Sequence, residues 1–148
     1  MGHEAIMAEV WGRMSNVTGV VKVDRNPSKP PSIGDLPVIH LFDQDDTVIS
    51  KSSRGGYPVY KRNFTLHIAT YISGLTNSSV SKELDLFIIE IKKQLYAGGA
   101  TLGKTCCDFE EVLTTSYKRP PISGDIIGTG LKFIINYLED IGNYMIGG

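Results

Sequence analysis

The protein has 148 residues, of which 41% are hydrophobic and 21% are charged, and its 15 basic and 16 acidic side chains leave a formal net charge of -1. This length is typical of a single domain, residues 1–148, that can bury a core without disulfide bonds. The near-neutral charge excludes a global field that would attract nucleic acid or an anionic membrane. No apolar run has the length of a membrane span, and residues 1–14 lack the basic and apolar regions of a signal peptide.

The first predicted elements are a helix over residues 3–14, whose apolar side chains share one face, and a strand over residues 19–24. We expect Trp11 to anchor the helix to the core; the alternative is an aromatic residue at a subunit interface. Residues 25–35 contain three prolines, which suit neither a helix nor a central strand. They are expected to form an extended Pro-rich arm or surface loop.

A short strand over residues 36–43 is apolar on both faces, which indicates burial on both sides. Residues 43–58 are polar, with Gly55 and Gly56 at the expected tip. They predict an extended loop, longer than a tight hairpin needs, and loops of this length are usually mobile or functional.

The clearest pattern lies in residues 57–96. A long strand alternates apolar and polar side chains, with Phe64, Leu66 and Ile68 on one face. A long helix follows, and its apolar residues recur at helical spacing from Val80 to Leu95. No catalytic group interrupts either element, so this half of the chain is expected to pack and assemble.

Alternation returns in residues 108–117 and again in residues 126–138, which predict two further strands, and the tail is apolar and rich in glycine. Strands joined by polar connections favour antiparallel pairing. The sequence therefore predicts an α+β fold, with a mostly antiparallel sheet of four to five strands and two helices packed on one face.

One motif suggests chemistry. Gly98, Gly103, Lys104 and Thr105 match the phosphate-binding pattern G-x-x-x-x-G-K-[ST], in which backbone amides and the lysine hold phosphates. That loop must follow a buried strand and begin a helix, whereas here it follows the predicted helix and precedes residues that alternate. We therefore favour a glycine-rich connection with Lys104 in solvent, and keep a small P-loop-type nucleotide-binding enzyme as the alternative.

Other candidate sites have weaker patterns. The three histidines, at positions 3, 40 and 67, lack metal-ligand spacing, and His40 and His67 can share a site only if their strands are neighbours. Asp43, Asp45 and Asp46 resemble the start of a calcium loop without its glycine and closing glutamate, which favours a solvated acidic loop.

The adjacent cysteines are expected to face opposite ways, Cys106 and Cys107 being ordinary residues of a reduced protein. No Ser-His-Asp or Cys-His set can be placed along the chain. The sequence therefore predicts no catalytic residue, no metal site and no cofactor, and a protein that is not an enzyme.

The order of elements resembles the tail terminator, or tail completion, proteins of long-tailed bacteriophages, which include small minor tail proteins. The likeness lies in an L-P-x-I strand (residues 36–42), an R-x-x-x-L-x-I-x-x-Y strand (residues 62–71), the long helix, and a last strand with Phe133 and Tyr137. It covers about residues 3–140 and consists of the order of the elements and their general sequence character more than of fixed residues.

The resemblance implies a structural virion protein, assembled in the host cytoplasm, that forms a hexameric ring. The ring would end the tail tube, contact the tube protein on one face and the head-side connector or stopper protein on the other, and let DNA pass without specific binding. Another small neck or connector protein is close in kind; an accessory protein-binding module is the third possibility.

The natural contact elements of such a ring are residues 25–35 and residues 43–58. Chemistry alone suggests four side chains for a subunit or tube interface: Lys51, Arg54, Tyr57 and Arg119.

Overall fold

The computed structural model describes residues 2–74, 80–112, 121–123 and 126–147. In chain order the elements are α1 (His3–Ser15), β1 (Lys22–Arg25), η1 (Ile33–Asp35), β2 (Val38–Arg54), β3 (Tyr57–Ser73), α2 (Val80–Leu95), β4 (Asp108–Glu111), β5 (Pro121–Ser123), β6 (Ile126–Asp140) and α3 (Ile141–Gly147).

The strands form one sheet in the order β1-β2-β3-β6-β4, with β5 paired to β6. Only β1 and β2 run parallel; the other pairs are antiparallel. β3 lies at the centre, paired with β2 from Val38↔Tyr71 to Arg54↔Tyr57 and with β6 from Val59↔Asp140 to Ser73↔Ile126. The predicted α+β fold with a mostly antiparallel sheet is thus confirmed.

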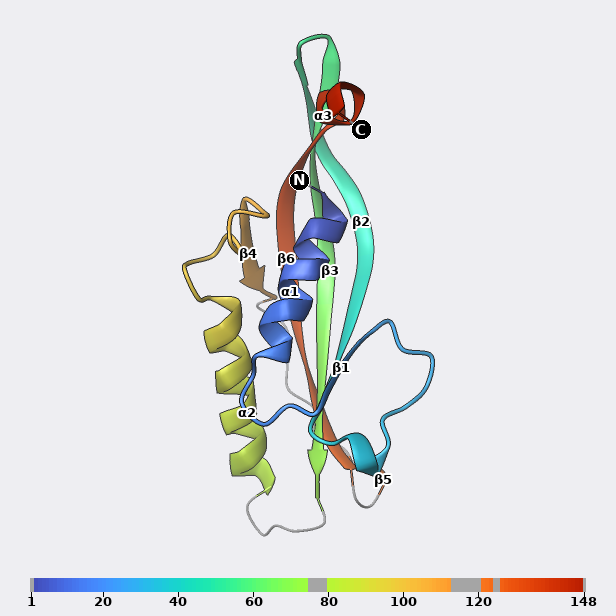
Figure 1. The fold of residues 1–148 in the computed structure, drawn as a ribbon, viewed down its shortest axis with the longest axis vertical. Helices are drawn as coiled ribbons and strands as arrows, with labels where there is room; N and C mark the ends of the chain where they lie inside the picture. The colour runs from blue at the N-terminus through green and yellow to red at the C-terminus, as the bar shows by residue number, and fades with distance from the viewer. Residues whose placement is uncertain (1, 75–79, 113–120, 124–125, 148) are drawn as a thin grey trace.

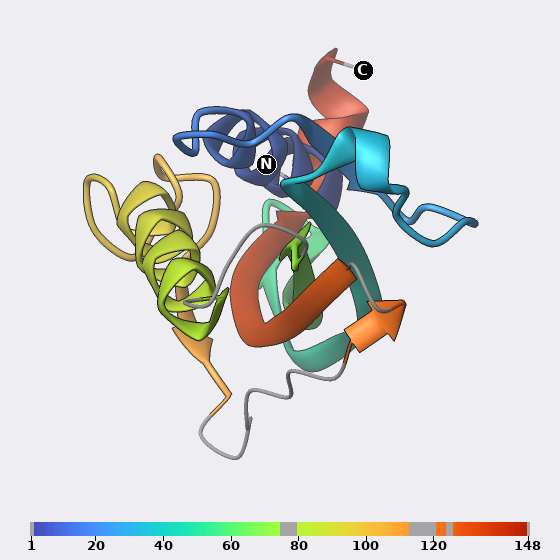
Figure 2. The ribbon, with the colours of Figure 1, turned by 90° about the horizontal axis from the view of Figure 1, so that it is seen from below.

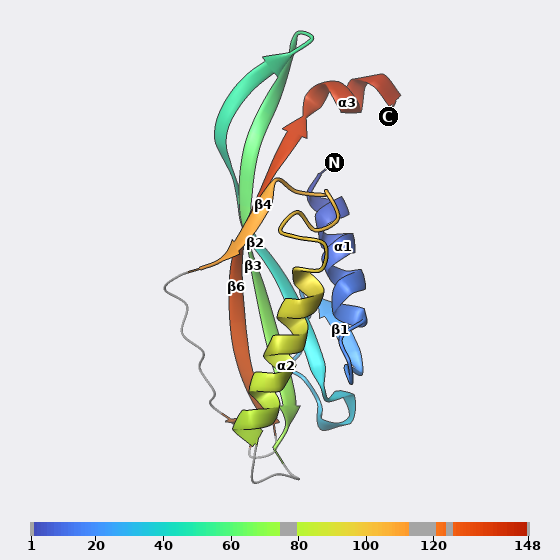
Figure 3. The ribbon, with the colours of Figure 1, turned by 90° about the vertical axis from the view of Figure 1, so that its left-hand side faces the viewer.

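Helices α1 and α2 cover the same face of the sheet (Figure 3) and lie next to each other when seen along the long axis (Figure 2). Their apolar stripes meet the inward residues of the central strands in one core. Its largest fully buried side chains are Ile6, Met7, Met14, Ile39, Leu41, Phe64, Leu66, Ile68, Leu84, Ile91, Leu95 and Phe133. The alternation of β3 and the helical spacing of α2 therefore place their apolar residues as the sequence predicted.

Two structural predictions need correction, and one element was not predicted. Residues 43–58 are not a loop: β2 continues to Arg54, turns through Gly55 and Gly56, and returns as β3. Trp11 is not a core anchor, since it is 48% exposed and its indole Nε1 lies 3.3 Å from the carbonyl oxygen of Val23. The tail forms a third helix, α3.

The predicted strand over residues 108–117 is described only as β4, and residues 113–120 lie outside the described part of the chain. Residues 25–35 lead from β1 through η1 to the parallel strand β2, as a surface connection (Figure 1). The first strand begins at Lys22, and the last extends to Asp140.

Arg13 of α1 fixes the end of α2. Its Nη1 lies 2.8–3.0 Å from the carbonyl oxygens of Gln94, Leu95 and Ala97, and its Nε donates to Glu9 at 2.9 Å. The last carbonyls of a helix have no partner within the helix, and they attract a cation through the helix dipole. One guanidinium thus caps α2 and joins it to α1.

We predict that Arg13→Ala lowers the free energy of unfolding by about 2 kcal/mol, since hydrogen bonds from a charged group to the α2 carbonyls are lost. Urea denaturation at neutral pH measures the change. Lys93→Ala is the matched control, because this cation of the last turn of α2 is 67% exposed; its effect should stay within about 0.5 kcal/mol. Equal effects would show that Arg13 is not a cap.

Candidate functional site: a projecting arm, its polar base and an open sheet face

The most prominent feature is the hairpin made by the distal parts of β2 and β3, residues 43–59, here called the arm. β1 pairs with β2 only from Val38 to Leu41, so within the described residues the rest of β2 has no strand partner but β3. The arm projects away from the body that α1 and α2 cover (Figures 1 and 3). Residues 47–57 are exposed throughout. Such an edge has unpaired backbone groups available to a partner.

Three of the four predicted interface residues lie in the arm. Lys51 and Tyr57 are exposed, and the Arg54 side chain is 76% exposed, with its Nη1 3.3 Å from an Asp140 carboxylate oxygen. Arg119 lies outside the described residues. The arm therefore gathers residues that the sequence assigned to a loop.

A one-residue bulge shapes the base of the arm. Gln44 pairs with Thr65 and Thr47 pairs with Asn63, so β2 has one residue more than β3 between these two pairs. Within this stretch Asp45 has a positive φ of 51°. In an unbroken strand Asp43 and Asp46 would face opposite sides. The extra residue brings both carboxylates to the face that α1 covers.

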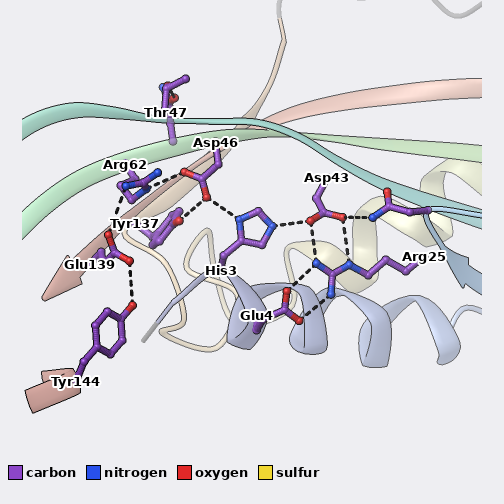
Figure 4. Close-up of polar contacts among 12 residues, drawn as sticks. His3, Glu4, Arg25, Asp43, Asp46, Thr47, Arg62, Tyr137, Glu139 and Tyr144 are labelled. Atoms are coloured by element: carbon purple, nitrogen blue, oxygen red, sulfur yellow. Dashed lines mark hydrogen bonds and ion pairs between the residues drawn. The ribbon is translucent and has the colours of Figure 1, made fainter. Parts of the chain in front are cut away.

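His3, at the start of α1, bridges these two carboxylates (Figure 4). Its Nε2 lies 2.6 Å from Asp43 and its Nδ1 2.7 Å from Asp46. Because each ring nitrogen contacts a different carboxylate, the ring ties Asp43 and Asp46 to the start of α1. The ring also stacks on Phe64, at 4.1 Å between centroids.

Two arginines complete the cluster. Arg25 of β1 donates to Asp43 at 2.8 Å and to both carboxylate oxygens of Glu4 at 2.8 and 2.9 Å. On the other side, Arg62 of β3 donates to Asp46 at 2.9 Å. Further contacts reach Tyr137, whose hydroxyl donates to Asp46, and Glu139, which accepts from Tyr144 of α3.

These contacts set the protonation of the cluster. The hydrogen bonds from Arg25 hold the pKa of Asp43 well below its usual range, against the effect of burial. Burial works to raise the pKa of Asp46, but donors from Tyr137, His3 and Arg62 outweigh it and the pKa is lowered. The expectation of a solvated acidic loop is thus wrong for Asp43 and Asp46, because both are bound to cations of other elements.

The open face of the sheet, opposite the helices, has an aromatic row. Tyr71 lies over Gly128 and His67 over Gly130, where an added Cβ would be 2.5 Å from each ring. His40 and Phe42 of the neighbouring strand adjoin them, with centroids 5.3 Å apart for His40–Tyr71 and 5.9 Å for Phe42–His67. Burial lowers the pKa of both histidines. His40 and His67 therefore do lie on neighbouring strands, in one aromatic row in which His40 is buried and His67 is half-buried.

The segment Gly98–Thr105 does not have phosphate-loop geometry. It follows α2 and leads to strand β4, so it does not begin a helix. The amides of Thr105 and Cys106 donate to the carbonyl of Thr101, and the amide of Lys104 to its hydroxyl. Lys104 is exposed, as expected, and Leu102 anchors the segment in the core.

Cys106 is buried and Cys107 exposed, which confirms that the pair faces opposite ways. Burial raises the pKa of the Cys106 thiol to about 12. No group of His, Cys, Asp and Glu among the described residues could hold a metal ion. In the same part of the chain, no helix is long and apolar enough to cross a bilayer.

No protein-family model matches the sequence, and no curated protein matches it.

We predict that Asp43→Asn makes the protein less stable at pH 7 and flattens the dependence of its stability on pH. The pKa of Asp43 is lower in the folded than in the unfolded protein, so its contribution is complete above about pH 5 and is lost as the pH falls through the folded pKa. Urea midpoints at pH 7 and pH 3 measure this. Asp45→Asn, at the exposed neighbouring position, should keep the wild-type slope; a wild-type slope in Asp43→Asn would contradict the assignment.

For the open face, we predict that Gly128→Ala lowers the free energy of unfolding by about 1–3 kcal/mol, because the new methyl group meets the Tyr71 ring and lies 3.0 Å from the carbonyl oxygen of Thr70. Thermal or urea unfolding measures it. Gly12→Ala in α1 is the control, with no atom within 4 Å, and should be neutral or stabilising by up to about 1 kcal/mol. A harmless Gly128→Ala would mean that Tyr71 is free to move aside.

Proposed function

We propose that the protein is a structural subunit of a bacteriophage tail: a tail terminator that forms a hexameric ring, ends the tail tube and joins it to the head-proximal connector or stopper protein. The observation that carries the proposal is the arm. It extends well past the helix-covered body, yet contributes little to the core, since residues 47–57 are exposed. A monomer has no need of such an element.

Exposed apolar side chains support the same proposal. Large hydrophobic residues are exposed along the arm and at its base, on β6 and α3: Val48, Ile49, Tyr57, Leu138, Tyr144 and Met145. Apolar surface concentrated in one region marks an interaction site, whereas single exposed apolar residues need no explanation. The sheet edge beside these residues adds unpaired backbone groups, which pair readily with a strand of another chain.

The charge balance suits passage of DNA through the ring. A net charge of -1 gives no strong attraction between subunit and phosphate backbone, so DNA would slide through without being held. The arm, the edges of the sheet and the helical layer give the subunit several separate surfaces for ring neighbours, tube and connector. The nucleotide-binding alternative has less support, because the amides around Gly103 are used within their own segment.

The proposal predicts that the purified protein, alone or with tail tubes, forms rings of six-fold symmetry that cap one tube end. Mass measurement in solution and negative-stain imaging test it. A monomer that never binds tube ends would contradict the proposal. Binding of ATP or GTP that is lost in Lys104→Ala would instead support the enzyme.

A further inference from the structure

The two edges of the sheet lie on opposite sides of the subunit. In the order β1-β2-β3-β6-β4, the free part of β2 belongs to one edge and β4 to the other. Figure 1 shows the same division, with β2 on one side and α2 and β4 on the other. A ring closes when one side of each copy binds the opposite side of the next, which is a heterologous contact. The chemistry of the two sides can therefore be compared directly.

The β2 side is basic and apolar. Between Thr47 and Arg62 the sequence has no carboxylate. Lys51 makes no ion pair among the described residues, and Arg54 remains largely exposed beside Asp140. Val48 and Ile49 are about half exposed, at 48% and 51%. A partner for this surface would offer carboxylates next to apolar side chains.

The opposite side offers both. β4 has the sequence DFEE, and Glu110 is exposed without an ion pair in the described part of the chain. Beside it, Tyr96 at the end of α2 stacks on Phe109 at 4.6 Å, which joins helix and strand into one surface. Farther along α2, Leu86 and Ile89 are 52% and 48% exposed.

We propose that the arm of one copy docks on the α2–β4 side of the next copy, with Lys51 facing Glu110, and Val48 and Ile49 facing the exposed apolar residues of α2. This contact rests on the proposed ring and specifies how its subunits join. The charges favour the head-to-tail orientation and disfavour pairing of like sides, because arm against arm brings cations together.

The base of the arm makes it a suitable docking element. His3, Arg25 and Arg62 bind the two carboxylates of the bulge from α1, β1 and β3, so the arm is held by three elements at the point where it leaves the body. An element that is already ordered loses little conformational freedom when it binds.

Cross-linking between two copies tests the contact. In a Cys107→Ser background, which keeps the buried Cys106, we would mix Lys51→Cys and Glu110→Cys proteins that carry different tags. Mild oxidation should give a disulfide-linked dimer containing both tags, and little from either protein alone. The control pair is Lys132→Cys with Glu110→Cys, because Lys132 is exposed on the open face of the sheet; it should give no dimer above background.

Charge reversal gives a second readout. Lys51→Glu should weaken assembly about tenfold or more, a change of about 1.4 kcal/mol. Adding Glu110→Lys to that variant should restore much of the assembly, and circular dichroism checks that each variant is folded.

The outcomes separate this contact from the proposed function. Six-fold rings that lack the cross-link and tolerate the charge reversal overturn the arm contact and leave the ring standing. The charge-reversed variant could also form normal rings that fail to bind tail tubes. That result would assign the arm to the tube protein and would also overturn the contact. Copies that neither assemble nor cross-link, with or without tubes, overturn both proposals.

Discussion

Strand β3 is hydrogen-bonded to a strand on each side, and the other elements are arranged around it. β2 and β6 both follow β3 for most of its length, so its direction sets the direction of the sheet and of the arm. Its alternation then divides the molecule: Phe64, Leu66 and Ile68 face α1 and α2, while His67 and Tyr71 face away. A shift of one residue would exchange these faces, and the large buried area makes that shift costly.

The arm leaves this sheet where β1 ends, and polar contacts take over from core packing at that point. The bulge at Asp45 turns two carboxylates toward α1, where His3, Arg25 and Arg62 contact them. Buried or half-buried carboxylates are tolerable only with such donors. The same contacts tie the start of α1 to β2, so the N-terminal helix serves both as a cover for the core and as a support for the arm.

The distribution of side chains is the basis of the proposed role in assembly. The densest cluster of titratable groups, around Asp43 and Asp46, is a set of matched ion pairs at a junction of elements. Exposed large apolar side chains lie on the arm, on β6, on α3 and along α2, and also at Trp11, Val21 and Ile33. Surfaces of this kind on opposite sides of one subunit suit a closed ring, since each copy then presents both halves of the contact.

Local periodicity in the sequence was enough to predict the elements that pack. The stripe from Val80 to Leu95 and the alternation around Leu66 predicted α2 and β3, because burial selects apolar residues at the spacing of the element. From the same patterns came the α+β fold class. The expectation that one of the tandem cysteines faces in and the other out was also correct, since Cys106 is buried and Cys107 is exposed.

The arm, the polar cluster at its base and the exposed position of Trp11 could not be predicted from local sequence patterns. An exposed edge strand has no buried face, so its sequence lacks alternation and resembles that of a loop. For this reason residues 43–58 were predicted to be a loop. The cluster joins residues 3, 25, 43, 46 and 62, which no local pattern connects. Whether Trp11 or its neighbour Val10 enters the core depends on how α1 is rotated against the sheet, and that rotation is set by contacts with distant strands.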